Sequence, residues 1–483
     1  MPLLFALAAL QSAASPTPAA VTDWRAVARA DVEAGYALMR DNHPGWVDGE
    51  NPAFREQLDK ARAEGLKAAE AATDPKGYGE ALSAFSTVLA DGHAGLLANS
   101  SSERKSQWPG FLTAWRGNRL LVTEGEASPG FGPGGEIIGC DGTPIAELIV
   151  RRLQPRGARL GEAGRWWSEG GKVLVNSAGT PLASCTVSLA GREVEAPLAW
   201  RDVPEDFFKR YLTASNGGYT DIGLVEPRPG LFVVGMPTFA NGPEAARLYG
   251  ALVDDIAKRH SALASARAIV LDLRFNQGGS SAWSRKVAGA LWGDKAVSTR
   301  VDAYFHPVEV WWRNSPGNIA YLDELAGKLR ESGQGNTADQ IAALAKRMTA
   351  AQAAGQAMTV EEAADSSPAP APASLALDRP TYVIVPGQCS SACLDAVDLF
   401  RLFPNVRLVG APTSADSQYM EIRTETLPSG KGQAVIPLKI WTHRPRKGGQ
   451  VYWPDIPMKQ LDWTTPAFLD AIEADLSKRG GTR

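Results

Sequence analysis

The stretch "PGQCSSACLDAVD" (residues 386–398) directly follows the apolar run "TYVIV" (residues 381–385). A short apolar run rich in β-branched residues is typical of a buried strand, and Gly387 permits a sharp turn after it. The apolar residues that follow recur at roughly helical spacing, namely Ala392, Val397, Phe400 and Phe403. The stretch therefore predicts a strand, a turn and a helix, with Ser391 at the junction between the turn and the helix.

A serine at the start of a helix has two interpretations. The first turn of a helix leaves backbone N–H groups without partners and carries the positive end of the helix dipole. These features suit a nucleophilic serine that must form a tetrahedral oxyanion. However, the stretch lacks the Gly-x-Ser-x-Gly elbow of the α/β-hydrolases. Taken alone, it fits a serine that merely caps the helix better, because serine is a preferred N-cap residue.

A catalytic serine needs a base, and the chain has five histidines. His93 lies in "LADGHAGL" (residues 89–96), where a glycine-flanked turn follows a predicted helix. Such a turn can present an imidazole to a cleft, although an ordinary surface turn explains the pattern equally well. Structural roles suffice for the other four: His43 in a His-Pro helix stop, His260 at a helix end, and His306 and His443 in aromatic surroundings.

A glycine loop supplies a third element. In "DLRFNQGGSS" (residues 272–281), a predicted strand ends, Gly278 and Gly279 follow, and a helical pattern begins. Backbone N–H groups in such a loop can bind an anion or an oxyanion. The loop has neither the Gly-Lys-Ser/Thr of a nucleotide P-loop nor the Gly-x-Gly-x-x-Gly spacing of a dinucleotide fold.

Length, charge and the N-terminus limit the class of protein. A chain of 483 residues predicts more than one domain, and a net charge of −3 without a basic stripe predicts no nucleic-acid partner. The run "MPLLFALAALQSAASPTPAA" (residues 1–20) predicts a signal peptide cleaved near Ala14 or Ala20, with a disordered Ala/Pro tail as the alternative. No other stretch is apolar enough for a membrane span. We therefore expect a soluble, exported protein, periplasmic or secreted.

The four cysteines allow three complete pairings and form no Cys-x-x-Cys motif, which argues against a zinc knuckle. Cys140 and Cys185 fall in one predicted β-rich segment, where a disulfide between them can form. Cys389 and Cys393 flank the two serines, but four-residue spacing within a helix is unfavourable for a disulfide.

Changes in periodicity divide the rest of the chain. We expect a helical region with the His93 element (residues 21–104), a β-rich domain (105–200) and a first α/β segment (201–312). A helical insertion with a Pro/Ala-rich linker (313–376) follows, acting either as a lid or as a passive surface excursion. A second α/β segment (377–483) carries Ser391.

The order of these motifs resembles that of the C-terminal processing (tail-specific) serine peptidases, most closely the tricorn-core branch. The similar elements are "DGHAGL" (91–96), "IVLDLRFNQGGSS" (269–281), "SSAC" (390–393), "LVGAPTS" (408–414) and "WPDI" (453–456). In addition, "GGEIIGCDGTPIAELI" (134–149) is similar to the PDZ segment of these enzymes. Together the similar elements span nearly the whole chain after the predicted signal.

The resemblance implies a ClpP/crotonase-like α/β core with an N-terminal helical region and an inserted PDZ-like domain. It also implies an exported serine endopeptidase that acts on a peptide or protein substrate and uses no metal or organic cofactor. Assembly into a homo-oligomer is compatible with this resemblance. The nucleophile would be Ser391 and the general base His93. The oxyanion hole would use the backbone N–H of Ala392 and that of Gly278 or Gly279.

The third catalytic residue departs from the family pattern, because no Glu stands shortly before the "PD" landmark. Asp455 is the candidate that would orient His93, with Glu421 and Gln450 as alternatives, while Lys431 in "GKGQAV" is a second candidate base. These departures leave two further hypotheses, an inactive exported peptide-binding protein of the same fold and an esterase that uses the same serine.

Overall fold

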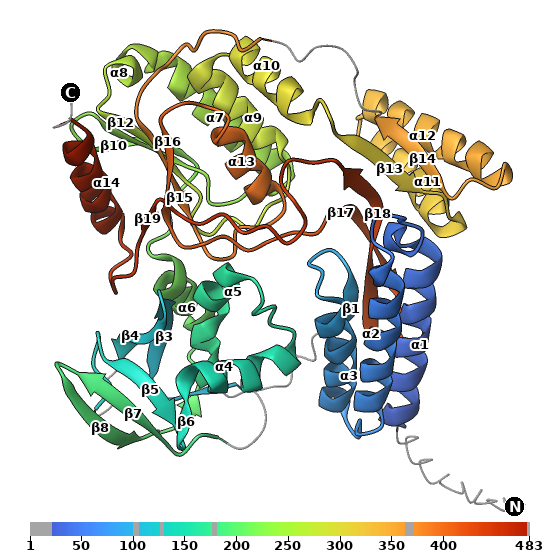
Figure 1. Ribbon diagram of the computed structural model, residues 1–483, viewed down its shortest axis with the longest axis horizontal. Helices are drawn as coiled ribbons and strands as arrows, with labels where there is room; N and C mark the ends of the chain where they lie inside the picture. Colours follow the sequence, from blue (N-terminus) through green and yellow to red (C-terminus); the bar gives the residue numbers. More distant parts are fainter. Residues whose placement is uncertain (1–21, 100–105, 126–129, 176–180, 363–370, 481–483) are drawn as a thin grey trace, which may run out of the picture.

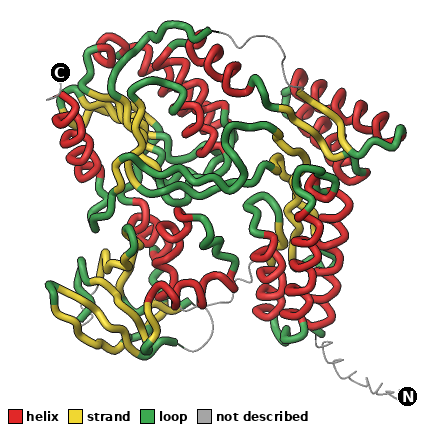
Figure 2. Tube along the Cα trace, viewed as in Figure 1, coloured by secondary structure: helices red, strands yellow, loops and turns green. Residues whose placement is uncertain are grey.

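The computed structural model describes residues 22–99, 106–125, 130–175, 181–362 and 371–480 (Figure 1). The predicted signal peptide and its cleavage site lie outside these ranges. Within them, no helix is long and apolar enough to cross a membrane. Figure 2 shows a mixed arrangement of helices and strands, with a helical bundle, a β-rich domain and an α/β core.

Three helices form the N-terminal bundle, and two of them begin at an aspartate that accepts a backbone N–H. Val32, Leu58 and Phe85 are fully buried in the shared core of the bundle. A left-handed residue, Ala90 (φ 54°), ends the third helix, and the chain turns through His93 into a strand. These elements are α1 (Trp24–Asn42), α2 (Ala53–Ala69), α3 (Pro75–Leu89) and β1 (Gly95–Ala98).

The β-rich domain is an antiparallel sheet of order β3-β4-β5-β7-β8, with β6 paired to β5. Cys140 and Cys185 are directly opposed on β5 and β7 and form a disulfide. The strands are β3 (Phe111–Arg116), β4 (Arg119–Gly125), β5 (Glu136–Cys140), β6 (Thr143–Pro144), β7 (Ser184–Leu189) and β8 (Arg192–Pro197). Its helices are α4 (Ile145–Leu153) and α5 (Ala163–Glu169), and α6 (Phe207–Asn216) follows the domain.

The core contains a six-stranded sheet of order β10-β11-β12-β15-β16-β19, parallel except for the pair β10-β11. The strands are β10 (Gly223–Arg228), β11 (Leu231–Gly235), β12 (Ala268–Asp272), β15 (Thr381–Val385), β16 (Val406–Gly410) and β19 (Ile456–Pro457). The helices of the core are α7 (Pro243–Lys258), α8 (His260–Ala264), α9 (Ala282–Trp292), α10 (Asp294–Phe305), α13 (Ala392–Phe400) and α14 (Thr465–Gly480).

Alternate residues of β15 enter two different apolar cores. Val383 and Val385 pack with residues of α7, α9 and α13, whereas Tyr382 and Ile384 pack with residues of α14 and of the β-rich domain. A strand buried on both faces reads as a continuous apolar run, as "TYVIV" does. The mixed α/β fold class predicted from the sequence is confirmed.

A second sheet, of order β1-β18-β13-β14 with β17 paired to β18, joins the bundle to the core. The helical insertion packs on this sheet, where Leu322, Met348 and Leu438 share one buried cluster. Asn318 also donates to the backbone oxygen of Asn42 at 2.9 Å, which fixes the insertion to α1. The elements are β13 (Glu309–Arg313), α11 (Pro316–Glu331), α12 (Gly335–Ala353), β14 (Met358–Glu362), β17 (Tyr419–Thr426) and β18 (Gly432–Thr442).

Candidate active site

Ser391 lies between β15 and α13 in a backbone conformation that L-residues rarely adopt, with φ 55° and ψ −131°. It occupies the N-cap position of α13, yet its side chain makes no capping hydrogen bond. The structure therefore does not support the interpretation of Ser391 as a helix cap. Its backbone N–H donates to Asp416 Oδ2 at 2.7 Å.

The two adjacent serines differ in their contacts. The hydroxyl of Ser390 donates to the backbone oxygen of Gln277 in the glycine loop at 3.1 Å. The hydroxyl of Ser391 is partly exposed and has no hydrogen-bond partner among the described residues. Only the hydroxyl of Ser391 is therefore free to act on a bound molecule.

A disulfide between Cys389 and Cys393 encloses both serines. The expectation that this spacing disfavours a bridge is wrong, because it assumed that both cysteines are helical. The helix begins only at Ala392, so Cys389 belongs to the turn, and the two Cα atoms lie 5.3 Å apart. The bridge closes the turn that carries Ser391 onto the first turn of α13.

The glycine loop lies directly against this turn. A Cβ atom on Gly278 would lie 2.8 Å from Ser391 Cβ and 3.1 Å from Ala392 N, so only glycine fits there. The N–H of Gly278 donates to Asn276 Oδ1 at 2.9 Å and is not free. By contrast, the N–H groups of Gly279 and Ala392 have no acceptor within the described ranges. Of the two glycines that the sequence left open, Gly279 is therefore the one with an available donor.

His93 lies in a turn that one internal hydrogen bond shapes, from its own N–H to Asp91 Oδ1 at 2.8 Å. Its Nδ1 atom is buried and has no hydrogen-bond partner. Burial raises the pKa of Asp91, while His93, the Ser417 hydroxyl and Arg159 act in the opposite direction. The turn thus reaches Ser417, next to the Asp416 that holds Ser391, although no hydrogen bond joins Ser391 to His93.

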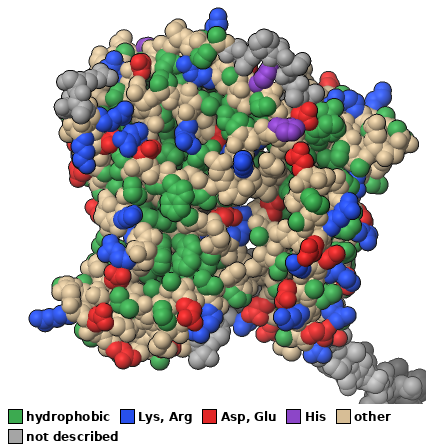
Figure 3. Space-filling view, in the orientation of Figure 1, with side chains coloured by type: hydrophobic (Ala, Val, Ile, Leu, Met, Phe, Trp, Pro, Cys, Tyr) green, Lys and Arg blue, Asp and Glu red, His purple; other side chains and the backbone are tan. Residues whose placement is uncertain are grey.

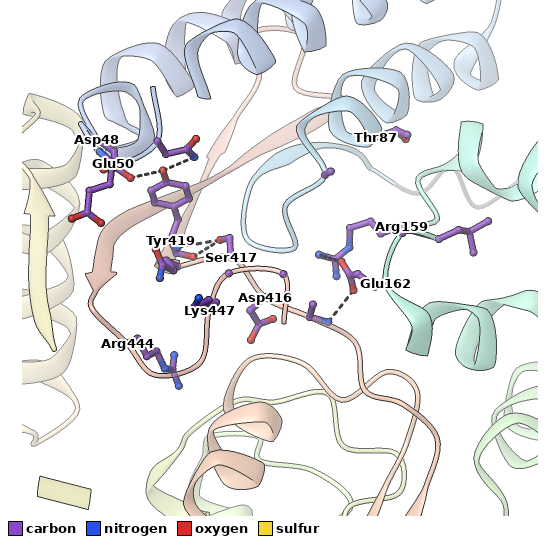
Figure 4. A pocket seen from close by; sticks show the side chains of 18 of the residues that line it. Asp48, Glu50, Thr87, Arg159, Glu162, Asp416, Ser417, Tyr419, Arg444 and Lys447 are labelled. Carbon is purple, nitrogen blue, oxygen red and sulfur yellow. Dashed lines mark hydrogen bonds and ion pairs between the residues drawn. The ribbon is translucent and has the colours of Figure 1, made fainter. Parts of the chain in front are cut away.

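A cavity of about 900 Å³ is lined by Asp416, which binds the N–H of Ser391, while Ser391 and His93 themselves are not among its lining residues (Figure 4). Asp416, Ser417 and Tyr419 line one wall, and Arg159 and Glu162 line another. The carboxylate of Glu162 pairs with Arg159 at 3.0 Å and accepts the N–H of Ala415 at 3.1 Å, which ties the two walls together. The cavity is large enough for several residues of a peptide.

A buried charged network supports the same wall, and the sequence did not reveal it. Asp395 and Asp398 of α13 pair with Arg444 and Arg446, and Arg446 also reaches Asp416 at 3.4 Å. Burial raises the pKa of Asp395, but the two arginines outweigh this effect and lower it to about 2. Two acids three residues apart in an otherwise apolar helix are the signal that could have identified it.

The structure does not bring the third catalytic candidate, Asp455, into contact with Nδ1 of His93. Asp455 accepts the backbone N–H of Leu408 at 2.8 Å. Glu421 pairs with Lys439 at 3.5 Å, and the Oε1 of Gln450 accepts the N–H of Lys447 at 3.1 Å. None of the three proposed orienting groups forms a hydrogen bond with Nδ1 of His93. The sequence could not show which backbone or side-chain group each of them would bind in the folded chain.

The second candidate base, Lys431, lies in the hairpin turn between β17 and β18. It is exposed, and its Nζ lies 5.2 Å from the centre of the Trp24 ring. This position fits an ordinary turn lysine. Across the described residues, no group of three or more His, Cys, Asp or Glu side chains is placed to hold a metal ion.

Comparison with known proteins identifies the core. Residues 233–456 match the model of peptidase family S41, a range that contains both Gly278 and Ser391. No curated protein matches the chain.

Solved structures share the fold. Mature CPAF has a TM-score of 0.62 at 12% identity, covering 95% of this chain and 99% of that one. Mature CPAF complexed with lactacystin gives 0.61 at 13% identity, covering 95% of this chain and 98% of that one. The tricorn protease also matches, but at a TM-score of 0.36, 11% identity and coverages of 92% and 36%, which is too low to support an argument. The resemblance to the C-terminal processing serine peptidases is confirmed, because the segment that carries the glycine loop and Ser391 matches the model of peptidase family S41 and is the core of a serine-type peptidase.

Proposed function

We propose that the protein is an exported endopeptidase that cleaves peptide bonds with Ser391 as nucleophile and His93 as general base. The observation that carries the proposal is the environment of Ser391. Its hydroxyl is free, its backbone is held in a rare conformation by Asp416, and Gly278 packs against it. The adjacent Ser390 lacks these features, because its hydroxyl is already bonded to Gln277.

The proposed reaction follows from these groups. Ser391 Oγ attacks the carbonyl carbon of the scissile bond while His93 accepts the hydroxyl proton. The N–H groups of Ala392 and Gly279 stabilise the negative oxygen of the tetrahedral intermediate. The C–N bond then breaks, and the amine leaves with the proton from His93. Water, deprotonated by His93, releases the acyl group and restores the serine.

The proposal of export has its own support. Residues 1–20 have the composition of a cleavable signal, and all four cysteines form disulfides, which persist mainly outside the cytoplasm. N-terminal sequencing of protein recovered from the exported fraction tests this part. A mature chain that begins near residue 15 or 21 supports it, whereas full-length protein found only in the cytoplasm contradicts it.

The nucleophile is tested with a fluorophosphonate probe on wild type, Ser391→Ala and Ser390→Ala. We expect wild type and Ser390→Ala to be labelled and Ser391→Ala to remain unlabelled. Ser390→Ala is a matched control because it removes a neighbouring hydroxyl from the same turn. If labelling survives in Ser391→Ala and is lost in Ser390→Ala, the nucleophile is Ser390 and the assignment of Ser391 is wrong.

A second candidate function, a peptide-binding protein without catalysis, is favoured by one observation. Nδ1 of His93 has no partner, so no carboxylate accepts a hydrogen bond from this atom. In serine proteases, disabling the orienting acid lowers kcat by about 10⁴-fold. A folded wild-type protein that binds peptides but never reacts with the probe would favour this function.

A further inference from the structure

A second cavity, of about 830 Å³, lies between the β-rich domain and the core. Four tryptophans line it, together with three prolines and a single charged residue, Lys459. Figure 3 shows hydrophobic side chains gathered on this face of the molecule, where the core meets the β-rich domain. We call this cavity the tryptophan pocket, after Trp115, Trp166, Trp167 and Trp453.

Two of the indoles already use their hydrogen-bond donors within the protein. Trp115 Nε1 donates to the backbone oxygen of Gly117 at 3.0 Å, and Trp166 Nε1 donates to that of Leu160 at 2.9 Å. Their ring centres lie 4.9 Å apart, with the planes tilted by 45°. These two indoles therefore offer ring faces rather than free N–H groups to the pocket, and ring faces favour apolar and aromatic side chains.

Trp453 is 70% exposed, the largest value among the exposed large hydrophobic side chains. A tryptophan that is mostly exposed beside an apolar cavity gains little from folding, because its ring stays in water. Clustered exposed apolar groups commonly mark a binding surface. Trp453 is thus placed to cover an occupant of the pocket rather than to stabilise the free protein.

The occupant follows from the position of the pocket. Leu160 and Gly161 line both the tryptophan pocket and the cavity lined by Asp416, so the two cavities adjoin at this segment. Glu162, the next residue, is bonded to Ala415 in the wall of the first cavity. Because the two cavities adjoin, a polypeptide bound in the first can place a side chain in the second.

We propose that the tryptophan pocket binds an aromatic or large aliphatic side chain of the polypeptide substrate, at a site separate from the scissile bond. This inference rests on the proposed function, since it assumes that a peptide occupies the cavity lined by Asp416. Lys459 in the lining disfavours a basic residue at this point of the substrate. The pocket would select unfolded or flexible polypeptides, which expose such side chains.

Binding is measured without turnover, in the Ser391→Ala protein. The probe is a fluorescein-labelled twelve-residue peptide containing Phe and Leu, compared with the same peptide carrying Ser at those positions. Adding Trp453→Ala is expected to weaken binding of the apolar peptide about tenfold, a loss typical of a buried aromatic anchor. Adding Trp453→Phe should restore most of the affinity, because an aromatic face is kept.

Phe208→Ala is the matched control. Phe208 is 67% exposed, lies on α6 and lines neither cavity, so its removal should leave binding unchanged. Equal binding in the presence and absence of Trp453→Ala, or an equal loss in Phe208→Ala, would overturn the proposal.

The two proposals fail in different ways. If wild type does not react with the fluorophosphonate probe but the apolar peptide still binds through Trp453, the pocket stands and the catalytic proposal is lost. If wild type reacts and binding does not depend on Trp453, the pocket proposal alone is overturned.

Discussion

The nucleophile turn (residues 386–392) and the histidine turn (residues 90–94) are held in very different ways. The first is closed by the Cys389–Cys393 disulfide, and Asp416 binds the N–H of Ser391. The second is shaped by one hydrogen bond within the turn, and Nδ1 of His93 has no partner. The fold therefore fixes the attacking group firmly and leaves the proton acceptor loosely oriented.

This difference has an energetic side. A residue with the backbone conformation of Ser391 is strained by about 1–3 kcal/mol, and such strain persists only when the surroundings enforce it. Here the surroundings are a covalent bridge, a buried carboxylate and a glycine loop with no room for a side chain. The histidine turn has no covalent bridge and Nδ1 of His93 has no hydrogen-bond partner, so we expect the orientation of the imidazole to depend on a bound peptide.

The largest expected effect comes from a substitution in the histidine turn. His93→Ala should lower kcat/KM by about 10²–10⁴-fold, the range typical of losing a general base. Lys431→Ala is the control, because Lys431 is an exposed turn residue packed over Trp24. Steady-state kinetics on a fluorogenic peptide measures both. Activity that survives in His93→Ala and disappears in Lys431→Ala would transfer the base to the lysine.

Beside the nucleophile turn, Gly278→Ala should slow fluorophosphonate labelling about a hundredfold. This effect is comparable to the loss of one oxyanion donor. A Cβ at this position would press on Ser391 Cβ and on the backbone of Ser390, at 2.8 Å from each. Gly242→Ala separates contact from backbone strain, because Gly242 has φ +129° but nothing within 4 Å of its Cβ position. Equal slowing in both variants would show that the contact with the nucleophile turn is unimportant.

The two disulfides offer a smaller test of the same contrast. Replacing Cys389 and Cys393 with alanine should slow labelling by about tenfold while the fold remains, because the turn loses its covalent closure but keeps Asp416. Replacing Cys140 and Cys185 with alanine should lower the free energy of unfolding by about 2–5 kcal/mol without changing the labelling rate. Labelling rates are compared below the melting temperature of either variant. Similar rates in both would mean that the bridge does not position Ser391.

The local part of the site could be predicted from the sequence, and the long-range part could not. The strand, turn and helix around Ser391 follow from a short apolar run, a glycine and helical spacing. The role of Asp416 does not, because a carboxylate 25 residues away reveals its partner only once the sheet has formed. Asp455 shows the same limit, because an acid chosen for its place in the "WPDI" motif binds the backbone N–H of Leu408.

The smallest expected effect concerns a second imidazole, His43 in the helical bundle, which, unlike His93, is fully buried. The Nδ1 atom of His43 accepts the N–H of Gly45 at 2.9 Å, and the ring stacks on Phe54 at 4.2 Å. Burial lowers the pKa of His43 to about 3, from an ordinary value of 6.5. Between these values the unfolded chain binds a proton that the folded chain does not, so acidification destabilises the fold.

This one group should lower the free energy of unfolding by about 1.4 kcal/mol for each pH unit below 6.5, or about 2 kcal/mol at pH 5. His43→Asn should remove that contribution, because an Asn side chain can still accept the N–H two residues on but does not titrate. Urea unfolding of wild type and variant from pH 7.5 to 4.5 measures the difference, with His443→Asn as the control for losing an exposed histidine. Parallel pH profiles for wild type and His43→Asn would mean that His43 is protonated inside the fold, and that the bundle does not hold this imidazole as tightly as its contacts indicate.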